Sequence, residues 1–258
     1  MDQKEAVIID LSVPLEHDAV SEPYPAKIRY VTHGAEGLAQ MREAFGVTEA
    51  DLVWSGGKGW AIEHIEAITH TGTHVDAPYH YAATSEGKPA RRIDELPLEW
   101  FYSDAVVLDF RTKPAGAEIT PTDIEAALAA IGYTLKPLDI VLIQTGADKR
   151  IATRDYFAQP GLGRDAVIWL ADRGVRVIGI DAYTLDRPFA AMVADFKRTG
   201  DGRHIWPAHF AGIDREYCQI EKLANLDQLP RPFGFKLSCF PVKIKGASAG
   251  WCRAVAIV

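Results

Sequence analysis

The sequence has few of the features that mark secreted or membrane-spanning proteins. Only three of its 258 residues are cysteines, Cys218, Cys239 and Cys252, and no Cys-x-x-Cys pair occurs. They are too few for a disulfide framework, so we expect reduced, mostly structural thiols. No apolar run approaches the roughly 18 residues that span a bilayer. Residues 1–5 lack a basic segment followed by an apolar one, so we expect no signal peptide and a cytoplasmic protein.

Positive charge is also scarce. The chain has 28 lysines and arginines against 35 aspartates and glutamates, a formal net charge of −7. A general nucleic-acid binder needs a basic face to displace phosphate counterions, and anionic lipid attracts basic surfaces. We therefore expect neither nucleic acid nor a membrane as partner, but a small-molecule substrate. The histidines are unevenly distributed, because three of the eight lie in the segment from His70 to His80.

The order of predicted elements indicates an α/β fold. No linker, low-complexity segment or internal repeat divides the chain, so residues 1–258 are expected to form a single domain. In the middle, strands alternate with helices, which predicts parallel pairing. Strands are expected at 6–11, 105–110, 139–145, 175–180, 233–244 and 252–258, helices at 35–45, 121–131 and 164–173, and a loop at 246–250.

The histidine cluster reads His-Thr-Gly-Thr-His-Val-Asp-Ala-Pro-Tyr-His from residue 70 to residue 80. His70, His74, Asp76 and His80 are separated by even numbers of residues, so in an extended chain they project to one face. Gly72 and the proline two residues after Asp76 oppose a helix, which favours an irregular strand. Two imidazoles and a carboxylate suit a borderline divalent cation such as Zn²⁺ or Mn²⁺, with a coordination position left open for water or substrate.

The histidine cluster has an alternative interpretation, and a later segment resembles a different catalytic motif. The histidines could be ordinary polar residues that make separate hydrogen bonds, but three of them plus an aspartate on one face favour a metal site. The segment Gly246 to Gly250 matches the Gly-x-Ser-x-Gly nucleophile elbow. That motif requires a following helix and a later acid and histidine, whereas no His, Asp or Glu follows Gly250.

The motif His-Thr-Gly-Thr-His-x-Asp-x-Pro-x-His resembles the signature of the cyclase family of metal hydrolases, which includes bacterial kynurenine formamidase and isatin hydrolase. The family also carries a later histidine with Glu or Gln twelve residues on, and here His209 is followed at that distance by Glu221. The resemblance extends over nearly the whole chain. It implies a compact α/β domain with a mixed, partly barrel-like sheet flanked by helices, of the swivelling β/β/α type.

The resemblance also implies a role for each matching residue. His70, His74 and Asp76 would bind a first metal ion. His209 and Glu221, together with Asp76, would complete that site or hold a second ion, giving one or two Zn²⁺ or Mn²⁺ ions per subunit. His80 would act as general acid/base beside the metal-bound water. Without metal, His209 and Glu221 would be a simple hydrogen-bonded pair.

The substrate is less well defined by the sequence. Trp60 precedes the metal-binding segment and Trp206 precedes the second motif, so both are candidates to line an apolar pocket, although either could simply pack in the core. Residues 14–60 and 183–205 are longer than in typical kynurenine formamidases, which favours an isatin-like cyclic amide as substrate. N-formylkynurenine, a lactone, or non-catalytic ligand binding are the alternatives. Relatives commonly form dimers or larger homo-oligomers, and 14–60 is the candidate contact segment.

Overall fold

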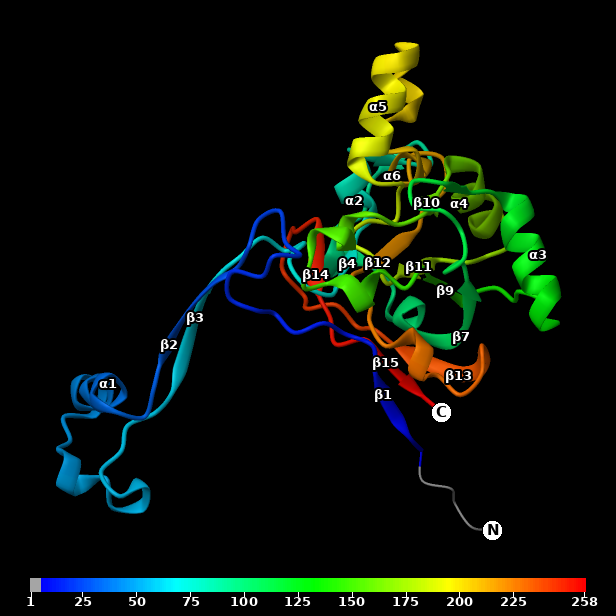
Figure 1. Cartoon of the computed structure of the whole chain (residues 1–258). Helices are drawn as coiled ribbons and strands as arrows, with labels where there is room; N and C mark the ends of the chain where they lie inside the picture. Colours follow the sequence, from blue (N-terminus) through cyan, green and yellow to red (C-terminus); the bar gives the residue numbers. More distant parts are fainter. Residues whose placement is uncertain (1–5) are drawn as a thin grey trace, which may run out of the picture.

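The computed structural model describes residues 6–258, and its centre is a nine-stranded mixed sheet (Figure 1). The four central strands β7, β9, β11 and β12 are parallel, and every other pairing in the sheet is antiparallel. In spatial order the strands are β1 (Ile8–Asp10), β15 (Val255–Ile257), β13 (Phe233–Ser238), β7 (Tyr102–Asp109), β9 (Ile140–Gln144), β11 (Val177–Ile180), β12 (Cys218–Glu221), β4 (His74–Asp76) and β14 (Ala249–Trp251).

Residues 6–258 contain six α-helices, and α3, α4 and α6 lie together beside the sheet in Figure 1. The helices are α1 (Ala35–Phe45), α2 (Pro78–Tyr81), α3 (Pro121–Ile131), α4 (Arg164–Asp172), α5 (Phe189–Thr199) and α6 (Pro207–Ala211). Helix α3 begins as predicted, because the Thr120 side chain accepts a hydrogen bond from the Asp123 backbone and Asp123 binds the Thr120 backbone in return. Gly132 ends it in the left-handed conformation.

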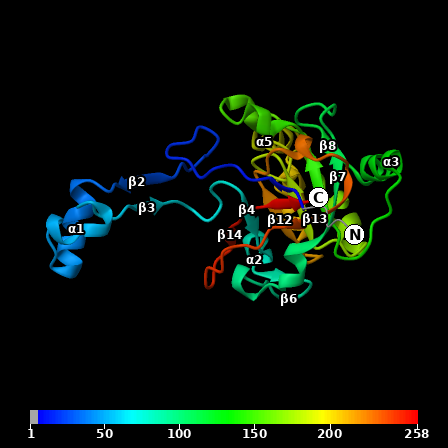
Figure 2. The ribbon, with the colours of Figure 1, turned by 90° about the horizontal axis from the view of Figure 1, so that it is seen from below.

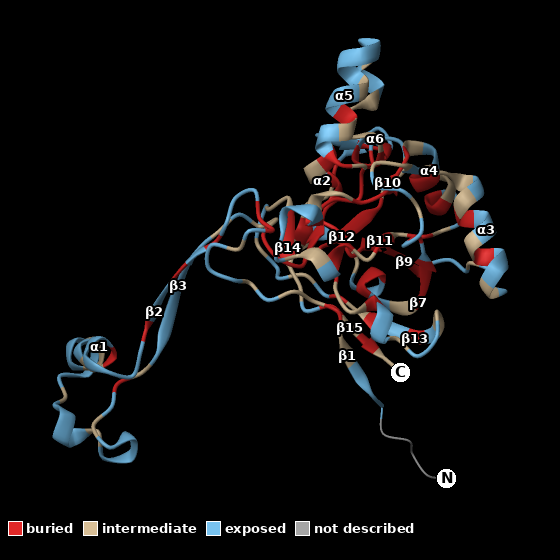
Figure 3. Cartoon of the chain, in the orientation of Figure 1, coloured by how far each residue is buried: buried red, intermediate tan, exposed pale blue. Residues whose placement is uncertain are grey.

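The central strands bury side chains on both faces, which explains why they read as continuous apolar runs. On β7, Val106 and Leu108 belong to the core cluster that packs under α3 and α4, whereas Ala105 and Val107 belong to a second cluster on the opposite face. Cys218 of β12 is fully buried in the second cluster, as expected of a structural thiol. The strands that carry the candidate metal ligands therefore lie inside the protein (Figure 3).

A hairpin-like arm projects from this body (Figures 1 and 2). It consists of the antiparallel pair β2 (Lys27–Val31) and β3 (Ile62–Glu66), with α1 at its far end. Gly37 of α1 packs so closely on the returning chain that a Cβ there would lie 2.1 Å from the Trp60 carbonyl oxygen. Most of the arm is exposed (Figure 3).

Three short two-stranded pairings complete the structure, formed by β2 with β3, by β5 (Thr84–Ser85) with β6 (Lys88–Pro89), and by β8 (Glu118–Ile119) with β10 (Gly161–Leu162). None of the helices described between residues 6 and 258 is long and apolar enough to cross a membrane.

The predicted α/β class, with a mixed and partly barrel-like sheet flanked by helices, is confirmed. The prediction that residues 1–258 form one domain stays a prediction, and the absence of a signal peptide rests on residues 1–5, which lie outside the described part. One strand prediction and one loop prediction were wrong in extent. The strand expected at 233–244 ends at Ser238, ahead of Pro241, and the expected loop at 246–250 contributes Ala249 and Gly250 to β14.

Candidate metal centre

Residues 70–80 bring four side chains to one point, although by a different path from the one predicted. Only His74–Asp76 is a strand, and His70 precedes it on a turn in which Gly72 has φ +66°. The prediction that the whole segment is extended was wrong, because Pro78 starts the short helix α2 that carries His80. Proline suits the first position of a helix, where its missing N–H costs nothing.

The three imidazoles converge on Asp76. His70 Nδ1 lies 2.7 Å from Asp76 Oδ1, and His74 Nε2 lies 3.2 Å from the same oxygen. His80 Nε2 is 4.0 Å from Asp76 Oδ2. Both His74 and Asp76 are fully buried.

The second predicted motif lies beside the first. Strand β12 pairs antiparallel with β4, so that Glu221 stands opposite His74 in the ladder. Glu221 Oε2 is 3.8 Å from His74 Nε2, and Glu221 Oε1 is 3.7 Å from Nε2 of His209, which lies on α6. The structure therefore brings together all five predicted ligands and His80.

Two buried acceptor atoms of this cluster have no hydrogen-bond partner, and this is the observation that fits a cation. His74 Nδ1 lies 2.8 Å from the Gly72 carbonyl oxygen and donates to it, so Nε2 carries a lone pair. That lone pair faces Asp76 Oδ1, and both atoms are buried and unpartnered. Two acceptors in contact repel each other unless a positive charge lies between them, either a bound cation or a proton on Nε2. Burial opposes that proton, but Asp76 outweighs burial and raises the pKa of His74. His70, Asp76 and His80, and likewise His74, Asp76 and Glu221, are close enough to share an ion.

Burial and charge act differently on the ionisable groups of the centre. Burial raises the pKa of Asp76, but the charges of His74 and His80 and the contact with His70 outweigh it and hold the pKa well below its usual range. Burial, followed by the negative charge of Asp76, raises the pKa of Glu221. Burial lowers the pKa of His80 to about 4, so its imidazole is neutral at neutral pH.

His209 is oriented by a carboxylate that the sequence analysis missed. Its Nδ1 makes a short hydrogen bond to Asp186, which is fully buried and also accepts the Ala208 N–H at 2.7 Å. This is the arrangement in which a carboxylate fixes an imidazole with Nε2 facing a ligand. Asp186 follows the β11 strand after a short loop, and nothing in its sequence spacing links it to His209.

A buried ion pair holds the turn of residues 70–73, called here the metal-binding turn, in place. Lys222 Nζ lies 2.5 Å from Glu22 Oε2 and donates to the His70 carbonyl oxygen at 2.7 Å, while Glu22 Oε1 accepts the Gly72 N–H at 2.8 Å. Thr73 Oγ1 donates to the Lys222 carbonyl oxygen at 2.6 Å. The non-ligand positions of the motif therefore attach the turn to β12 and to the residues that lead into the arm.

A cavity of about 260 Å³ opens onto the centre and includes His70, His80, His209 and Glu221 among its lining residues. Its apolar wall contains Tyr183, Phe189 and Trp206. The Trp206 ring stacks on His209, with centroids 4.2 Å apart and planes at 10°. Trp206 has a φ of +56°, in the left-handed region, immediately before α6. This conformation is uncommon for a bulky residue, and it accompanies the stacking of the ring on His209.

Trp60, the other predicted pocket residue, lies elsewhere. It belongs to the arm, where its indole N–H donates to Gln40 Oε1 at 2.7 Å and its ring packs edge-on against Phe45. It does not line the cavity of its own chain. The sequence position of Trp60, just before β3, gave no sign that β3 runs out along an arm.

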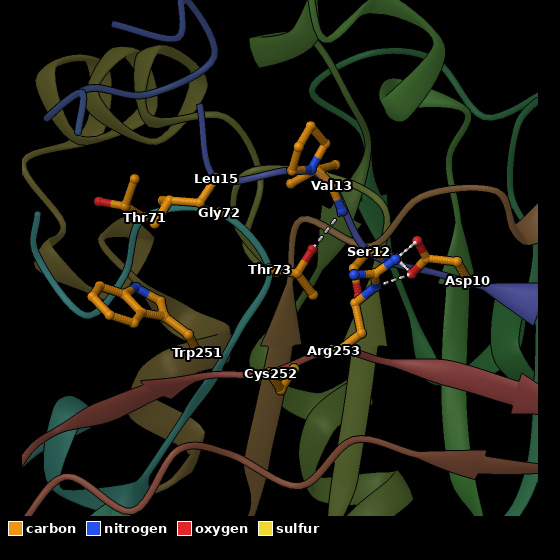
Figure 4. A pocket seen from close by; sticks show the side chains of 11 residues that line it. Asp10, Ser12, Val13, Leu15, Thr71, Gly72, Thr73, Trp251, Cys252 and Arg253 are labelled. Carbon is orange, nitrogen blue, oxygen red and sulfur yellow. Dashed lines mark hydrogen bonds and ion pairs between the residues drawn. The ribbon is translucent and has the colours of Figure 1, made fainter. Parts of the chain in front are cut away.

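A second cavity of about 300 Å³ lies behind the metal-binding turn (Figure 4). It is bounded by Leu15, Gly72 and Trp251, and by the ion pair of Asp10 with Arg253. Figure 4 also shows the hydrogen bond from the Val13 N–H to Thr73 Oγ1, at 2.9 Å. None of the predicted ligands lines this cavity, so the chemistry belongs to the first one.

Comparison with known proteins identifies the family of this chain. The chain matches the model of the cyclase family, described as "Putative cyclase", over residues 9–187. It is 30% identical over 187 residues to a kynurenine formamidase of Salinibacter ruber (strain DSM 13855 / M31), covering 72% of this chain and 75% of that protein. The chain therefore belongs to the cyclase family.

Solved structures show the same fold. Isatin hydrolase A from Ralstonia solanacearum matches with a TM-score of 0.75 and 25% identity over 98% of this chain and 92% of that one. An isatin hydrolase bound to the product analogue thioisatinate matches with a TM-score of 0.76 and 22% identity, covering 98% and 93%. The predicted family and the predicted enzyme class, a metal-dependent hydrolase that acts on carbon–nitrogen bonds other than peptide bonds, are confirmed.

Proposed function

We propose that the protein hydrolyses a cyclic aromatic amide, such as an isatin-like lactam, with a divalent ion, Zn²⁺ or Mn²⁺, at the metal centre. The observation that carries this proposal is the unpartnered pair of acceptors, His74 Nε2 and Asp76 Oδ1, at the edge of an aromatic cavity. His70, His74 and Asp76 would hold the ion, with Glu221 beside them. When bound, the ion supplies an activated water and polarises the substrate carbonyl.

His80 performs the proton transfers in this proposal. Hydrolysis adds the oxygen of water to the carbonyl carbon and a proton to the leaving nitrogen. A neutral imidazole accepts the proton released by the attacking water and delivers it to that nitrogen. Burial keeps His80 neutral, since it lowers the pKa to about 4, and His80 lies on the cavity wall.

The cavity supports a flat substrate. Trp206, Phe189 and Tyr183 offer ring surfaces, and aromatic rings stack favourably on one another. The structural match to isatin hydrolase A covers 98% of this chain. N-formylkynurenine is the second candidate because of the 30% identity to a kynurenine formamidase. A lactone fits the same chemistry.

We further propose that the subunits form a homodimer or larger homo-oligomer through the arm, in the cytoplasm. Apolar side chains of the arm, including Phe45, Val53 and Trp54, are exposed, and Trp54 has 103% relative exposure. Exposed apolar patches of this kind mark contact surfaces. A second copy of the chain is the expected partner.

Two variants test the chemistry. His74→Ala is expected to lose bound metal and turnover together. His80→Ala is expected to keep the metal content while turnover falls by about 10²–10⁴-fold. Metal content would be measured by mass spectrometry, and turnover of isatin, N-formylkynurenine and lactones would be followed with Mn²⁺ or Zn²⁺ restored. His204→Ala, at a partly exposed histidine that does not line the cavity, is the control and should match wild type. Full metal and turnover in His74→Ala would overturn the proposal, as would wild-type turnover in His80→Ala for the acid/base role.

A further inference from the structure

Gln219 lies in the middle of the candidate metal centre. It belongs to β12, is fully buried, and stands directly opposite Asp76 in the ladder with β4. Its amide nitrogen is 3.0 Å from Asp76 Oδ2, 2.6 Å from His209 Nε2 and 3.0 Å from Glu221 Oε1. These three residues are the set that could hold a second ion.

The hydrogens of this amide match the acceptors around it. Glu221 Oε1 already accepts the Leu185 N–H at 2.9 Å. The two N–H groups of Gln219 are then available for Asp76 Oδ2 and for His209 Nε2, which bears a lone pair because Nδ1 donates to the Asp186 carboxylate. The reverse orientation of the amide would set its oxygen against a carboxylate oxygen and an imidazole lone pair. The Tyr217 hydroxyl lies 3.1 Å from Gln219 Oε1 and 2.9 Å from the Ala208 carbonyl oxygen, so these two acceptors share its single proton.

Gln219 lies on one side of Asp76, and the opposite side has no such amide. His74 Nε2 and Asp76 Oδ1 have no hydrogen-bond partner, and they face the side on which His70 lies. Asp76 therefore presents one oxygen, Oδ2, to the Gln219 amide and the other, Oδ1, to the imidazoles of His70 and His74. The centre has one side ready for a cation and one side already satisfied by an amide.

We propose that the chain binds a single divalent ion, and that the Gln219 amide takes the place of a second one. An ion on the second side would need to lie about 2.0–2.2 Å from its ligands, and a nitrogen 2.6–3.0 Å from the same three atoms leaves no room for it. His209 is then not a metal ligand but positions Gln219 and the stacked Trp206. This inference rests on the proposed metal-dependent function.

The test is the number of ions per chain. Wild type and Gln219→Glu would be stripped of metal, loaded with Mn²⁺, passed through a desalting column and analysed by mass spectrometry. We expect one ion in wild type and two in Gln219→Glu, because a carboxylate replaces a donor by an acceptor of the same size. Electron paramagnetic resonance should show an isolated Mn²⁺ signal in wild type and a coupled pair in the variant. Gln144→Glu, at a buried glutamine of β9 that does not line the cavity, should keep one ion.

The outcomes distinguish a failure of the single-ion inference from a failure of the proposed hydrolase function. Two ions in wild type would overturn the inference and leave the hydrolase intact. One ion in both wild type and Gln219→Glu would also overturn it. No bound ion in wild type would overturn the metal-dependent function and the inference together. If Gln219→Glu does not fold, Gln219→Ser opens the same space without added charge and is expected to bind a second ion at raised Mn²⁺. A single ion there would count against the inference.

Discussion

Single residues decide how the metal centre is built, and several of them are not ligands. Asp186 fixes His209, Lys222 and Glu22 hold the turn that carries His70, and Gln219 fills the space beside Asp76. The candidate ligands could be selected from the sequence because they lie at set spacings within one short segment and one later motif. Gln219 could have been noticed, since it shares the face of β12 with Glu221, two residues on. Asp186 could not, because only the folded chain places it against His209.

Replacing Asp186 by asparagine should lower the stability of the folded protein. The carboxylate accepts the His209 Nδ1–H and the Ala208 N–H inside the protein, and an amide can satisfy only part of this pattern. We expect Asp186→Asn to lower the free energy of unfolding by about 2–4 kcal/mol, as for other disrupted buried pairs. Urea unfolding followed by circular dichroism would measure it.

Asp172→Asn provides the matched control for that experiment. Asp172 pairs with Arg215 on the surface, where ion pairs contribute less than about 1 kcal/mol. Similar losses in the two variants would contradict the role given to Asp186.

At the scale of elements, local signals and long-range pairing account for different parts of the fold. Helix α3 could be predicted because Thr120, Pro121, Asp123 and Gly132 set both of its ends. Strand β14 could not, since Ala249 and Gly250 have little strand preference and are extended because they pair with β4. Gly250 fits there because a Cβ would lie 2.5 Å from the Val242 carbonyl oxygen.

The edge strand β1 provides a test that depends on pH. Asp10 at its end pairs with Arg253, with Nη2 and Oδ2 2.7 Å apart. The hydrogen bond from Arg253 lowers the pKa of Asp10 below the ordinary value for an aspartate. The pair therefore stabilises the folded state above the unfolded pKa, and that stabilisation is lost as the pH falls through the lowered folded pKa.

We accordingly expect Asp10→Asn to reduce the free energy of unfolding by less than about 1 kcal/mol at pH 7, because both side chains are partly exposed. The difference from wild type should shrink towards zero below the lowered pKa of Asp10. Urea unfolding at pH 7, 5 and 3 would show this, and a difference independent of pH would refute the assignment. Arg253→Gln should reproduce the same pH dependence.

At the scale of the whole molecule, the arm is the feature that the sequence did not predict. Helix α1 was expected at 35–45, but a helix pattern contains no information about where the helix lies relative to the sheet. The order of the nine strands was equally inaccessible, because β12 pairs with β4 from a distant part of the sequence. Chain order predicted only the parallel pairing of β7, β9 and β11, and no strand was expected where β12 lies.

Shortening the arm should separate assembly from folding. Val31 and Ile62 face each other in the β2–β3 ladder, so residues 32–61 can be replaced by Asn-Gly, which favours a tight hairpin turn. We expect the shortened chain to fold, with unchanged metal content, but to have the mass of a monomer by light scattering. A shortened chain that keeps the oligomeric mass of wild type would show that the arm is not the contact.

The pairing of β4 with β12 also governs when the protein becomes able to take up a cation. His74 and Asp76 come from the first third of the chain, and Glu221 and Gln219 face them from near its end. A slip of one residue would turn all the facing side chains to the opposite side of the sheet. The chain thus has no complete set of candidate ligands until β4 and β12, which lie far apart in the sequence, have found their register. We therefore expect ion uptake to depend on this long-range pairing, so that a bound ion would report its correct register.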